Sequence, residues 1–262
     1  MEVTEPYVRD NTSYVSVKPI EPDVESHLQV DLLNILRRAV DEQADILVYP
    51  EMLGTEELAE YLSGKLDLRD NILDNGFPRL TICPTIWKQN RNYCKVLDDI
   101  GEVVCEQQKH HGVDLKQFKS KEDITSDRVI YILHCYGIGR IAIAICKDFI
   151  LTDYLRILAE YLKVSLLLVP SFTSGDYQFR ELASKYPEKD CNVIWINTCS
   201  ARWLNKDGEA GASVSLAYLP GRRGKLNTEI KETEDFYGKQ YSYGRICVYT
   251  YYIALGAEEK RR

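Results

Sequence analysis

The chain has 262 residues, of which 45% are hydrophobic and 28% are charged, and its formal net charge is −7. This length and composition are typical of a soluble globular protein that buries one large core. The negative charge argues against a nucleic-acid surface or an anionic-membrane surface, and no apolar run reaches the roughly 18 residues of a membrane-spanning helix.

The N-terminus and the cysteines predict the cellular compartment. The first residues are polar and acidic and lack the apolar segment of a signal peptide. None of the cysteines forms a CxxC pair, so we expect reduced, buried thiols in a cytoplasmic protein. Neither the cysteines nor the four histidines have the spacing of zinc ligands, so we expect no metal. The eight cysteines are Cys83, Cys94, Cys105, Cys135, Cys146, Cys191, Cys199 and Cys247.

Helical periodicity alternates with short apolar runs in the first half of the chain. Apolar residues recur at helical spacing over residues 27–39, and Asp23 or Ser26 could cap this helix. In chain order, we expect a strand over 13–20, the helix over 27–39, a strand over 46–48 ended by Pro50, a helix over 55–65 capped by Thr55, a strand over 80–83, and a β-hairpin of 93–97 and 102–107 with Gly101 in its turn.

The second half continues in the same way. A strand pair is expected around the turn Gly137-Ile138-Gly139, and a buried strand is expected to stop at Pro170. In chain order, we expect strands over 129–136 and 140–145, a helix over 151–161, a strand over 165–169, a helix over 179–186, strands over 193–197 and 213–219, a turn over 220–224 and a strand over 244–255.

This order of elements predicts an α/β layered sandwich with mixed sheets. The sequence contains no low-complexity linker and no internal repeat, so we expect a single domain over residues 1–262. The two ends, 1–12 and 256–262, are expected to be flexible.

Three reactive side chains lie at or near the ends of apolar runs. They are Glu51, Lys109 and Cys146, a carboxylate, an ammonium and a thiol. A thiolate is a strong nucleophile, a carboxylate can act as its general base, and an ammonium can stabilise an oxyanion. Together these groups can form a covalent hydrolytic site.

With these segments placed, the chain resembles the nitrilase or carbon–nitrogen hydrolase superfamily. That family has a "PE" strand end, a Lys after a hairpin and an "IC-x-D/E" segment, and the matches here are Pro50-Glu51, Lys109 and Ile145-Cys146 with Asp148. Further matches in family order are Asn92 through Gly101 to Lys109, Gly139-Arg140-Ile141, Leu168-Val169-Pro170-Ser171, the stretch 193–197, and Gly211-Ala212-Ser213 with Pro220-Gly221.

The resemblance implies an αββα four-layer sandwich in which Glu51, Lys109 and Cys146 converge on one pocket. It also implies a homodimer. We expect Cys146 to form a thioester with a small amide or carbamoyl substrate, Glu51 to act as general base, and Lys109 to stabilise the oxyanion together with the backbone N–H of Lys147. This chemistry requires no cofactor.

Several positions depart from the family pattern. A polar N-terminal stretch precedes the first predicted strand, Lys147 replaces a residue that is often aromatic, and Ile150 replaces a frequent Arg. Glu122 is the candidate for a second family Glu, although its flanks match poorly. We expect accessory roles for three residues: Glu122, Asp148 behind the nucleophile loop, and His110 at the pocket mouth.

Other interpretations remain open. A strand-end Cys is more often a packed small hydrophobe. A Cys–His protease using His110 or His111 is disfavoured, because adjacent strand residues point to opposite faces. The chain could instead be an interaction or regulatory domain of a larger protein, for example one fused to a synthetase or a defence reverse transcriptase. The same three groups could also transfer an acyl group to an amine rather than to water.

Overall fold

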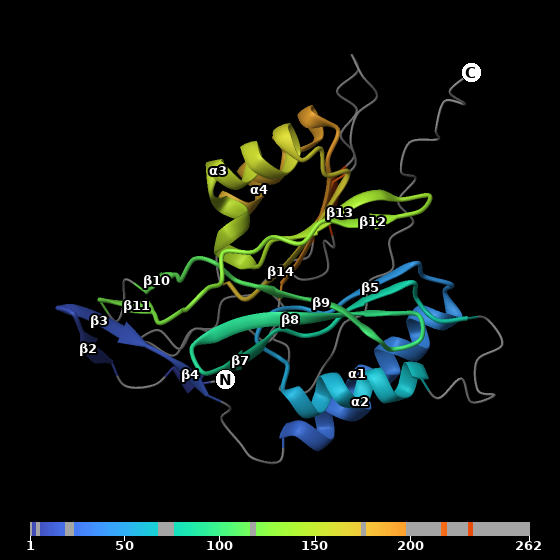
Figure 1. Cartoon of the computed structure of the whole chain (residues 1–262), viewed down its shortest axis with the longest axis horizontal. Helices are drawn as coiled ribbons and strands as arrows, with labels where there is room; N and C mark the ends of the chain where they lie inside the picture. The colour runs from blue at the N-terminus through green and yellow to red at the C-terminus, as the bar shows by residue number, and fades with distance from the viewer. Residues whose placement is uncertain are drawn as a thin grey trace. The chain divides into compact units, whose positions relative to one another are not determined.

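The computed structural model describes residues 2–3, 6–18, 24–67, 76–115, 119–173, 177–197, 216–218 and 230–232 (Figure 1). The chain divides into two compact units, Met1–Val129 and Ile130–Arg262, and each is described by itself. Outside the described residues lie the predicted turn over 220–224, the predicted strand over 244–255, and two of the cysteines, Cys199 and Cys247.

The main sheet of the first unit confirms the predicted strands and the predicted hairpin. Its strand order is β5-β6-β8-β7, with β9 paired to β8; β5 and β6 run parallel, and the other pairs are antiparallel. The strands are β5 (Ile46–Val48), β6 (Leu80–Ile82), β7 (Ile86–Lys88), β8 (Arg91–Asp98) and β9 (Val103–Gln108).

Two amphipathic helices, α1 (Val24–Asp41) and α2 (Glu56–Asp67), cover one face of this sheet (Figure 1). The Thr55 hydroxyl accepts a hydrogen bond of 3.1 Å from the N–H of Leu58, as expected for the predicted cap. Leucines spaced three to four residues apart on the helices pack against strand residues. The buried cluster includes Leu32, Leu36, Leu58, Leu62 and Leu66 from the helices, and Leu47, Tyr49, Tyr93 and Leu97 from the sheet side.

The turn of the β8–β9 hairpin is fastened to α2. Gly101 has φ +83°, and a Cβ there would clash with the carbonyl oxygen of Ser63. The Ser63 hydroxyl donates a 2.7 Å hydrogen bond to the Gly101 carbonyl. Only glycine combines this backbone conformation with so close an approach.

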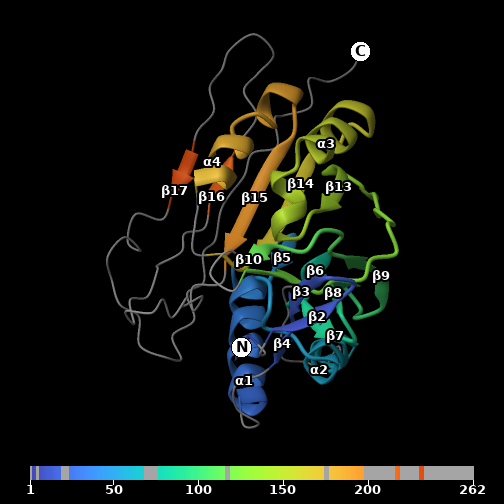
Figure 2. The same cartoon turned by 90° about the vertical axis from the view of Figure 1, so that its left-hand side faces the viewer.

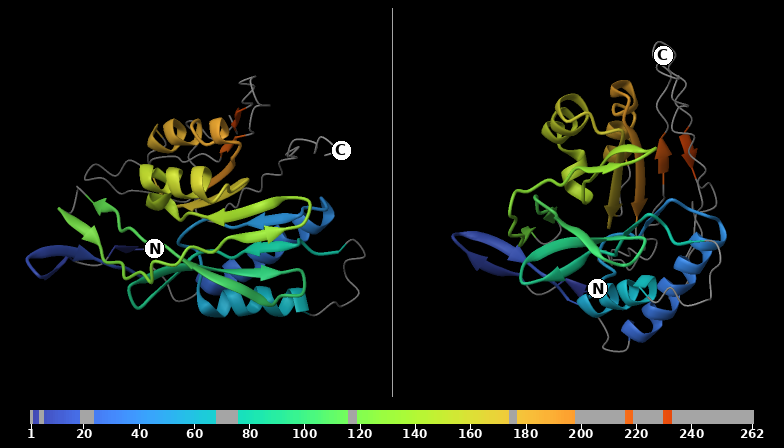
Figure 3. Two further views of the ribbon diagram at one scale, coloured as in Figure 1. Left: turned by 45° about the horizontal axis from the view of Figure 1, so that its top comes forward. Right: turned by 45° about the vertical axis from the view of Figure 1, so that its right-hand side comes forward.

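A second, small sheet was not predicted. It has the order β10-β11-β3-β2, and β3 runs parallel to β11 (Figure 3). Its strands are β2 (Tyr7–Arg9), β3 (Thr12–Val15), β10 (Asp114–Leu115) and β11 (Ser120–Glu122). Asp10 and Asn11 join β2 to β3 with φ values of +50° and +58°, the conformation of a type I′ hairpin turn. Part of the stretch expected to be flexible, 1–12, is therefore strand.

The predicted strand over 13–20 is interrupted at Ser16. The part of it that the structure describes consists of β3 and the two-residue strand β4 (Val17–Lys18), which pairs with β1 (Glu2–Val3). The weak alternation of residues 13–20 did not show that this stretch forms two short strands with different pairing partners.

The second unit contains a mixed sheet of order β12-β13-β14-β15-β16-β17, in which β13, β14 and β15 run parallel and side by side (Figure 2). Helical segments lie on one face of it (Figure 3). The strands are β12 (Leu133–Cys135), β13 (Gly139–Ile143), β14 (Leu166–Ser171), β15 (Asn192–Asn197), β16 (Leu216–Tyr218) and β17 (Ile230–Glu232).

Two predictions for this unit need correction. The strand expected to stop at Pro170 continues through it to Ser171. Because β13 pairs only with Leu166–Leu168, Pro170 borders a strand only on the β15 side, an edge-like position that tolerates a missing N–H. The helix expected over 151–161 is a short α3 (Thr152–Tyr154) that continues as a π-helix (Leu155–Tyr161).

Four aromatic rings stack in series in the second unit. Phe149 lies 5.8 Å from Phe179 and 5.1 Å from Tyr186, and Phe179 lies 4.8 Å from Trp195, as ring-centroid distances. Phe179 belongs to α4 (Tyr177–Ala183), which replaces the helix expected over 179–186. Trp195 is fully buried in this stack, so core packing is its role in the described residues. No helix in the described part of the chain is long and apolar enough to cross a membrane.

Candidate active site

Glu51 follows β5 by three residues and turns into the interior. Only 1% of its surface is exposed. Its Oε1 accepts hydrogen bonds of 2.8 Å from Lys109 Nζ and 2.8 Å from Asn92 Nδ2. A carboxylate this deeply buried needs such partners, because the loss of hydration is otherwise costly.

Lys109 directly follows β9, and its ammonium lies between two carboxylates. The Nζ atom is 2.8 Å from Glu51 Oε1, and 2.9 and 3.1 Å from the two oxygens of Glu122. The Lys109 N–H donates a 2.7 Å hydrogen bond to the carbonyl of Asn92 and so extends the β8–β9 ladder by one residue. The end of the predicted hairpin thus places Lys109 beside Glu51.

The structure brings Glu122 into this cluster from the unpredicted small sheet. Glu122 is the last residue of β11 and is 7% exposed. Its Oε2 also accepts a 2.9 Å hydrogen bond from the N–H of Val113, so both carboxylate oxygens are engaged. Its accessory role in catalysis stays a prediction.

Two carboxylates and one ammonium therefore share a buried volume. Burial raises the pKa of Glu51, the Lys109 ammonium opposes that rise, and the Glu122 carboxylate adds to it; the hydrogen bond from Asn92 also opposes it. The net direction is upward. A carboxylate with a raised pKa is a better proton acceptor than an ordinary one at neutral pH.

Asn92 is the residue that links the other members of the cluster. It lies on β8, is fully buried, and contacts Glu51 through its side chain and Lys109 through its carbonyl oxygen. The sequence predicted it only as part of a motif, without a site role. The available sequence signal was a polar amide directly before Tyr93 and Cys94, at the start of a predicted strand; in the structure all three residues are buried.

Cys146 belongs to the second unit and follows β13 by three residues. It begins the 3₁₀ helix Cys146–Ile150, is 3% exposed, and has φ +50°. This left-handed conformation is uncommon for a residue with a side chain and costs about 1–3 kcal/mol. A nucleophile placed on a sharp strand-to-helix turn is a recurrent arrangement in hydrolases.

The residues after Cys146 continue this turn. Lys147 is half-buried, and Asp148 is almost fully buried, with its N–H donating a 3.1 Å hydrogen bond to the carbonyl of Ile145. Burial, and next the Asp148 carboxylate, raise the pKa of Tyr154. The oxyanion role of the Lys147 N–H and the structural role of Asp148 stay predictions.

His110 is half-buried beside Lys109 in the sequence. Its Nε2 lies 3.0 Å from the carbonyl oxygen of Val129, and its ring meets that of His111 edge-on at 6.4 Å. The two ring planes are inclined by 70°. The place of His110 at the pocket mouth stays a prediction.

The structure thus describes two groups of predicted site residues, each within its own unit. Glu51, Lys109 and Glu122 meet in the first unit, and Cys146 with Lys147 and Asp148 forms a turn in the second. Among the described residues, no group of three or more His, Cys, Asp or Glu side chains is arranged to hold a metal ion.

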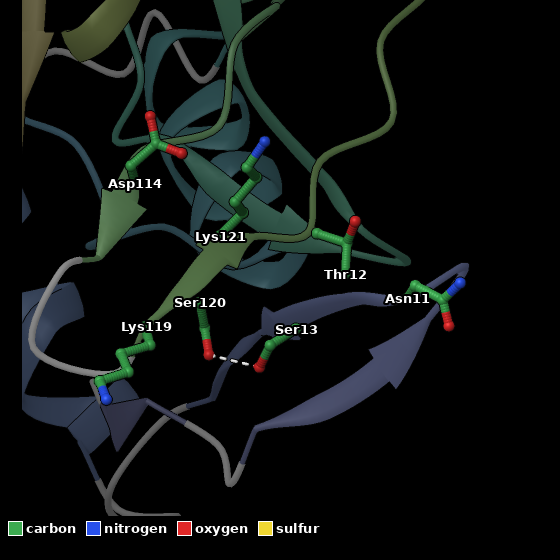
Figure 4. Close-up of a pocket in the computed structure, with 7 residues that line it drawn as sticks. All are labelled: Asn11, Thr12, Ser13, Asp114, Lys119, Ser120 and Lys121. Carbon is green, nitrogen blue, oxygen red and sulfur yellow. Dashed lines mark hydrogen bonds between the residues drawn. The ribbon is translucent and has the colours of Figure 1, made fainter.

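An open polar pocket lies elsewhere on the first unit, over the small sheet (Figure 4). The Ser13 and Ser120 hydroxyl oxygens are 2.6 Å apart across it, while Lys119 and Lys121 point away from each other. The pocket contains none of the predicted site residues, and its two cations do not converge on one point.

No protein-family model and no curated protein matches the sequence. Solved structures do match. An amidase from Nesterenkonia sp. aligns with a TM-score of 0.59 at 17% identity, over 78% of this chain and 80% of that chain. Nit3 of Saccharomyces cerevisiae, a member of branch 10 of the nitrilase superfamily, aligns with a TM-score of 0.57 at 16% identity, over 76% of this chain and 78% of that chain.

The chain therefore has the α/β fold of the nitrilase superfamily, as the sequence predicted. One structure of the Nesterenkonia amidase carries the acetamide moiety of fluoroacetamide added covalently to the active-site cysteine. At 16–17% sequence identity, this structural similarity shows the fold alone.

Proposed function

We propose that this protein is a carbon–nitrogen hydrolase that cleaves the amide bond of a small, non-peptide substrate. The observation that carries the proposal is the buried cluster of Glu51, Lys109 and Glu122. Replacing a buried ion cluster with apolar residues is often neutral or stabilising. Apolar packing could therefore stabilise the fold as well as this cluster does. Retaining it is consistent with a chemical role.

In the proposed first step, Glu51 takes the proton of the Cys146 thiol, and the sulfur attacks the carbonyl carbon of the amide. The carbonyl oxygen becomes an oxyanion, which the Lys109 ammonium and the backbone N–H of Lys147 stabilise. Glu51 then gives its proton to the departing nitrogen. The C–N bond breaks, ammonia or an amine leaves, and a thioester remains on Cys146.

In the second step, Glu51 takes a proton from water, and the resulting hydroxide attacks the thioester carbonyl. The C–S bond breaks, a carboxylic acid leaves, and Glu51 returns its proton to the sulfur, which regenerates the thiol. Glu122 keeps Lys109 fixed throughout, because both of its oxygens lie within hydrogen-bonding distance of Nζ. Such prior alignment is the main source of electrostatic stabilisation in an enclosed site.

The fold supports this assignment, since its structural neighbours include an amidase with a reactive cysteine. Butyramide and acrylamide are bound in other structures of that amidase. Short aliphatic amides are therefore the first substrates to test on this chain.

The test is ammonia release from butyramide by the wild type, by Cys146→Ala and by a matched control, Cys191→Ala. Cys191 is also a buried thiol, with its pKa raised by burial to about 12, and it lies outside the proposed machinery. We expect Cys146→Ala to abolish ammonia release and Cys191→Ala to preserve it. Equal turnover by Cys146→Ala and the wild type would refute the proposal.

Product mass then separates hydrolysis from acyl transfer. Hydrolysis of butyramide gives the free acid, whereas transfer to an added amine gives a substituted amide. We expect the acid as the main product even with an amine present. A substituted amide as the main product would show that Glu51, Lys109 and Cys146 serve an acyltransferase rather than a hydrolase.

A further inference from the structure

The N-terminal hairpin, formed by β2 and β3, contacts the strand that carries Glu122. β3 pairs in parallel with β11, with Tyr14 opposite Lys121 and Val15 opposite Glu122. The pairing continues one residue further, because the N–H of Asp123 donates a 2.9 Å hydrogen bond to the carbonyl of Val15. The polar stretch that departs from the family pattern is therefore built into the edge of the cluster.

Asp123 receives most of the polar contacts in this region. It is fully buried, and its carboxylate accepts hydrogen bonds from the Tyr7 hydroxyl, from Arg9 at 2.5 and 3.2 Å, and from Asn90 Nδ2 at 2.8 Å. The Arg9 guanidinium also stacks over the Tyr14 ring at 4.6 Å. Tyr7 and Arg9 come from β2, whereas Asn90 comes from the turn before β8.

Asp123 and Glu122 are adjacent, and adjacent residues of an extended chain point to opposite sides. The Asp123 side chain contacts the hairpin, while the Glu122 side chain contacts Lys109 and the N–H of Val113. On the side opposite the hairpin, Gly112 lies so close that a Cβ there would clash with the Glu122 carbonyl oxygen. The backbone at Glu122 is thus fixed from both sides.

We propose that Asp123 is a positioning residue, and that the β2–β3 hairpin, acting through Arg9, holds the Glu122 carboxylate against the Lys109 ammonium. The contacts form a continuous path from Arg9 to Asp123, through the backbone to Glu122, and on to Lys109. The consequence for catalysis rests on the proposed function. The placement of the Glu122 carboxylate by the hairpin is a structural claim that is independent of the proposed function.

The test compares Arg9→Ala with Arg38→Ala. Arg38 is a matched control, because it also has a partly exposed side chain and pairs with one carboxylate, that of Glu42 at 2.6 Å, but it lies on α1 away from β11. Arg9→Lys tests rescue by a retained charge. Asp123→Asn keeps the shape and removes the charge that Arg9 binds.

The first readout is hydrogen exchange of the Val113 amide, measured by NMR. This N–H donates directly to Glu122 Oε2, so its protection reports the position of that carboxylate without any substrate. We expect exchange at Val113 to be at least about tenfold faster in Arg9→Ala and Asp123→Asn, unchanged in Arg38→Ala, and partly restored in Arg9→Lys.

The second readout is butyramide turnover. We expect kcat to fall about tenfold or more in Arg9→Ala, with KM changed much less, because Glu122 aligns Lys109 and makes no proposed contact to the substrate. Unchanged Val113 exchange in both Arg9→Ala and Asp123→Asn would overturn the positioning proposal even if the wild type is a good amidase. Faster Val113 exchange in Arg9→Ala and Asp123→Asn, together with a wild type that hydrolyses no amide, would support the positioning and count against the proposed function.

Discussion

Lys109 Nζ lies 2.8 Å from Glu51 Oε1, and neither side chain is more than 2% exposed. At this depth the attraction between the charges offsets the cost of removing each from water, and Glu122 supplies a second acceptor for the same ammonium. The cation is therefore the group on which both carboxylates depend, whereas either carboxylate alone could lose its charge and leave the other paired.

This asymmetry predicts different stabilities for two substitutions. Lys109→Met leaves two buried carboxylates without a cation, and we expect it to lower the free energy of unfolding by about 3–5 kcal/mol at neutral pH. Glu51→Gln keeps the shape and leaves Lys109 paired with Glu122, so we expect a change of less than about 1 kcal/mol. Urea denaturation of both variants provides the measurement. A Lys109→Met protein as stable as the wild type would show that the cluster is not buried as described.

The raised pKa of Glu51 predicts an acidic limb in the pH profile. A general base must be deprotonated, so kcat/KM should rise as pH increases through the pKa of Glu51, which lies above its ordinary value. For stability the sign is opposite. A carboxyl whose pKa is higher in the folded state stabilises the fold at low pH and loses that contribution as pH rises through the folded value. We expect the wild type to lose more stability than Glu51→Gln over that interval, measured by denaturation at a series of pH values. Identical slopes would contradict a raised pKa.

Asn92 provides a separate test of the same carboxyl. Its hydrogen bond to Glu51 favours the ionised form. Removing it in Asn92→Ala should move the acidic limb of kcat/KM further toward high pH and reduce kcat. Asn192→Ala is a suitable control, because Asn192 is another buried amide, donating 3.0 Å to the carbonyl of Ser165. A limb that does not move in Asn92→Ala would indicate that Asn92 supports only the fold.

The backbone at Cys146 predicts an unusual ranking of variants. Glycine in place of alanine within regular structure usually costs about 0.5–1 kcal/mol, but at φ +50° glycine avoids the strain that alanine keeps. Cys146→Gly should therefore be at least as stable as Cys146→Ala. The reference is Ala144→Gly, two residues earlier and fully buried, which should lose stability in the ordinary way. If Cys146→Gly is clearly the less stable of the two, the turn is not strained.

Much of the first unit's site was predictable from local signals. Glu51 and Lys109 follow strands that are recognisable by their apolar runs, and Gly101 marks the turn that brings β9 back beside β8. Thr55 likewise caps the helix that it was expected to cap. Each of these depends on residues close together in the sequence, for which periodicity and turn chemistry are informative.

The remainder depended on contacts between distant segments. β2, β10 and β11 are short and polar, so their sequences carry no alternation that would identify them as strands, and β3 was expected only as part of a longer, weakly alternating strand over 13–20. Glu122 lies on β11, which pairs with β3, more than a hundred residues earlier in the chain. The Asp10-Asn11 turn was the available local signal for the hairpin. The prediction that the strand stops at Pro170 was wrong because it used a local rule about proline. That rule does not consider which side of the strand has a pairing partner.

The attachment of Gly101 to Ser63 has a consequence for how this chain can diverge. The β8–β9 hairpin is held at its turn by α2 and at its open end by the pairing of Lys109 with Asn92. Between these two points, Val103 and Val104 are about half exposed, at 49% and 48%. Substitutions can accumulate at these two positions over evolutionary time without altering the position of Lys109. Gly101 lacks that freedom, although it lies at the opposite end of the hairpin from the reactive groups.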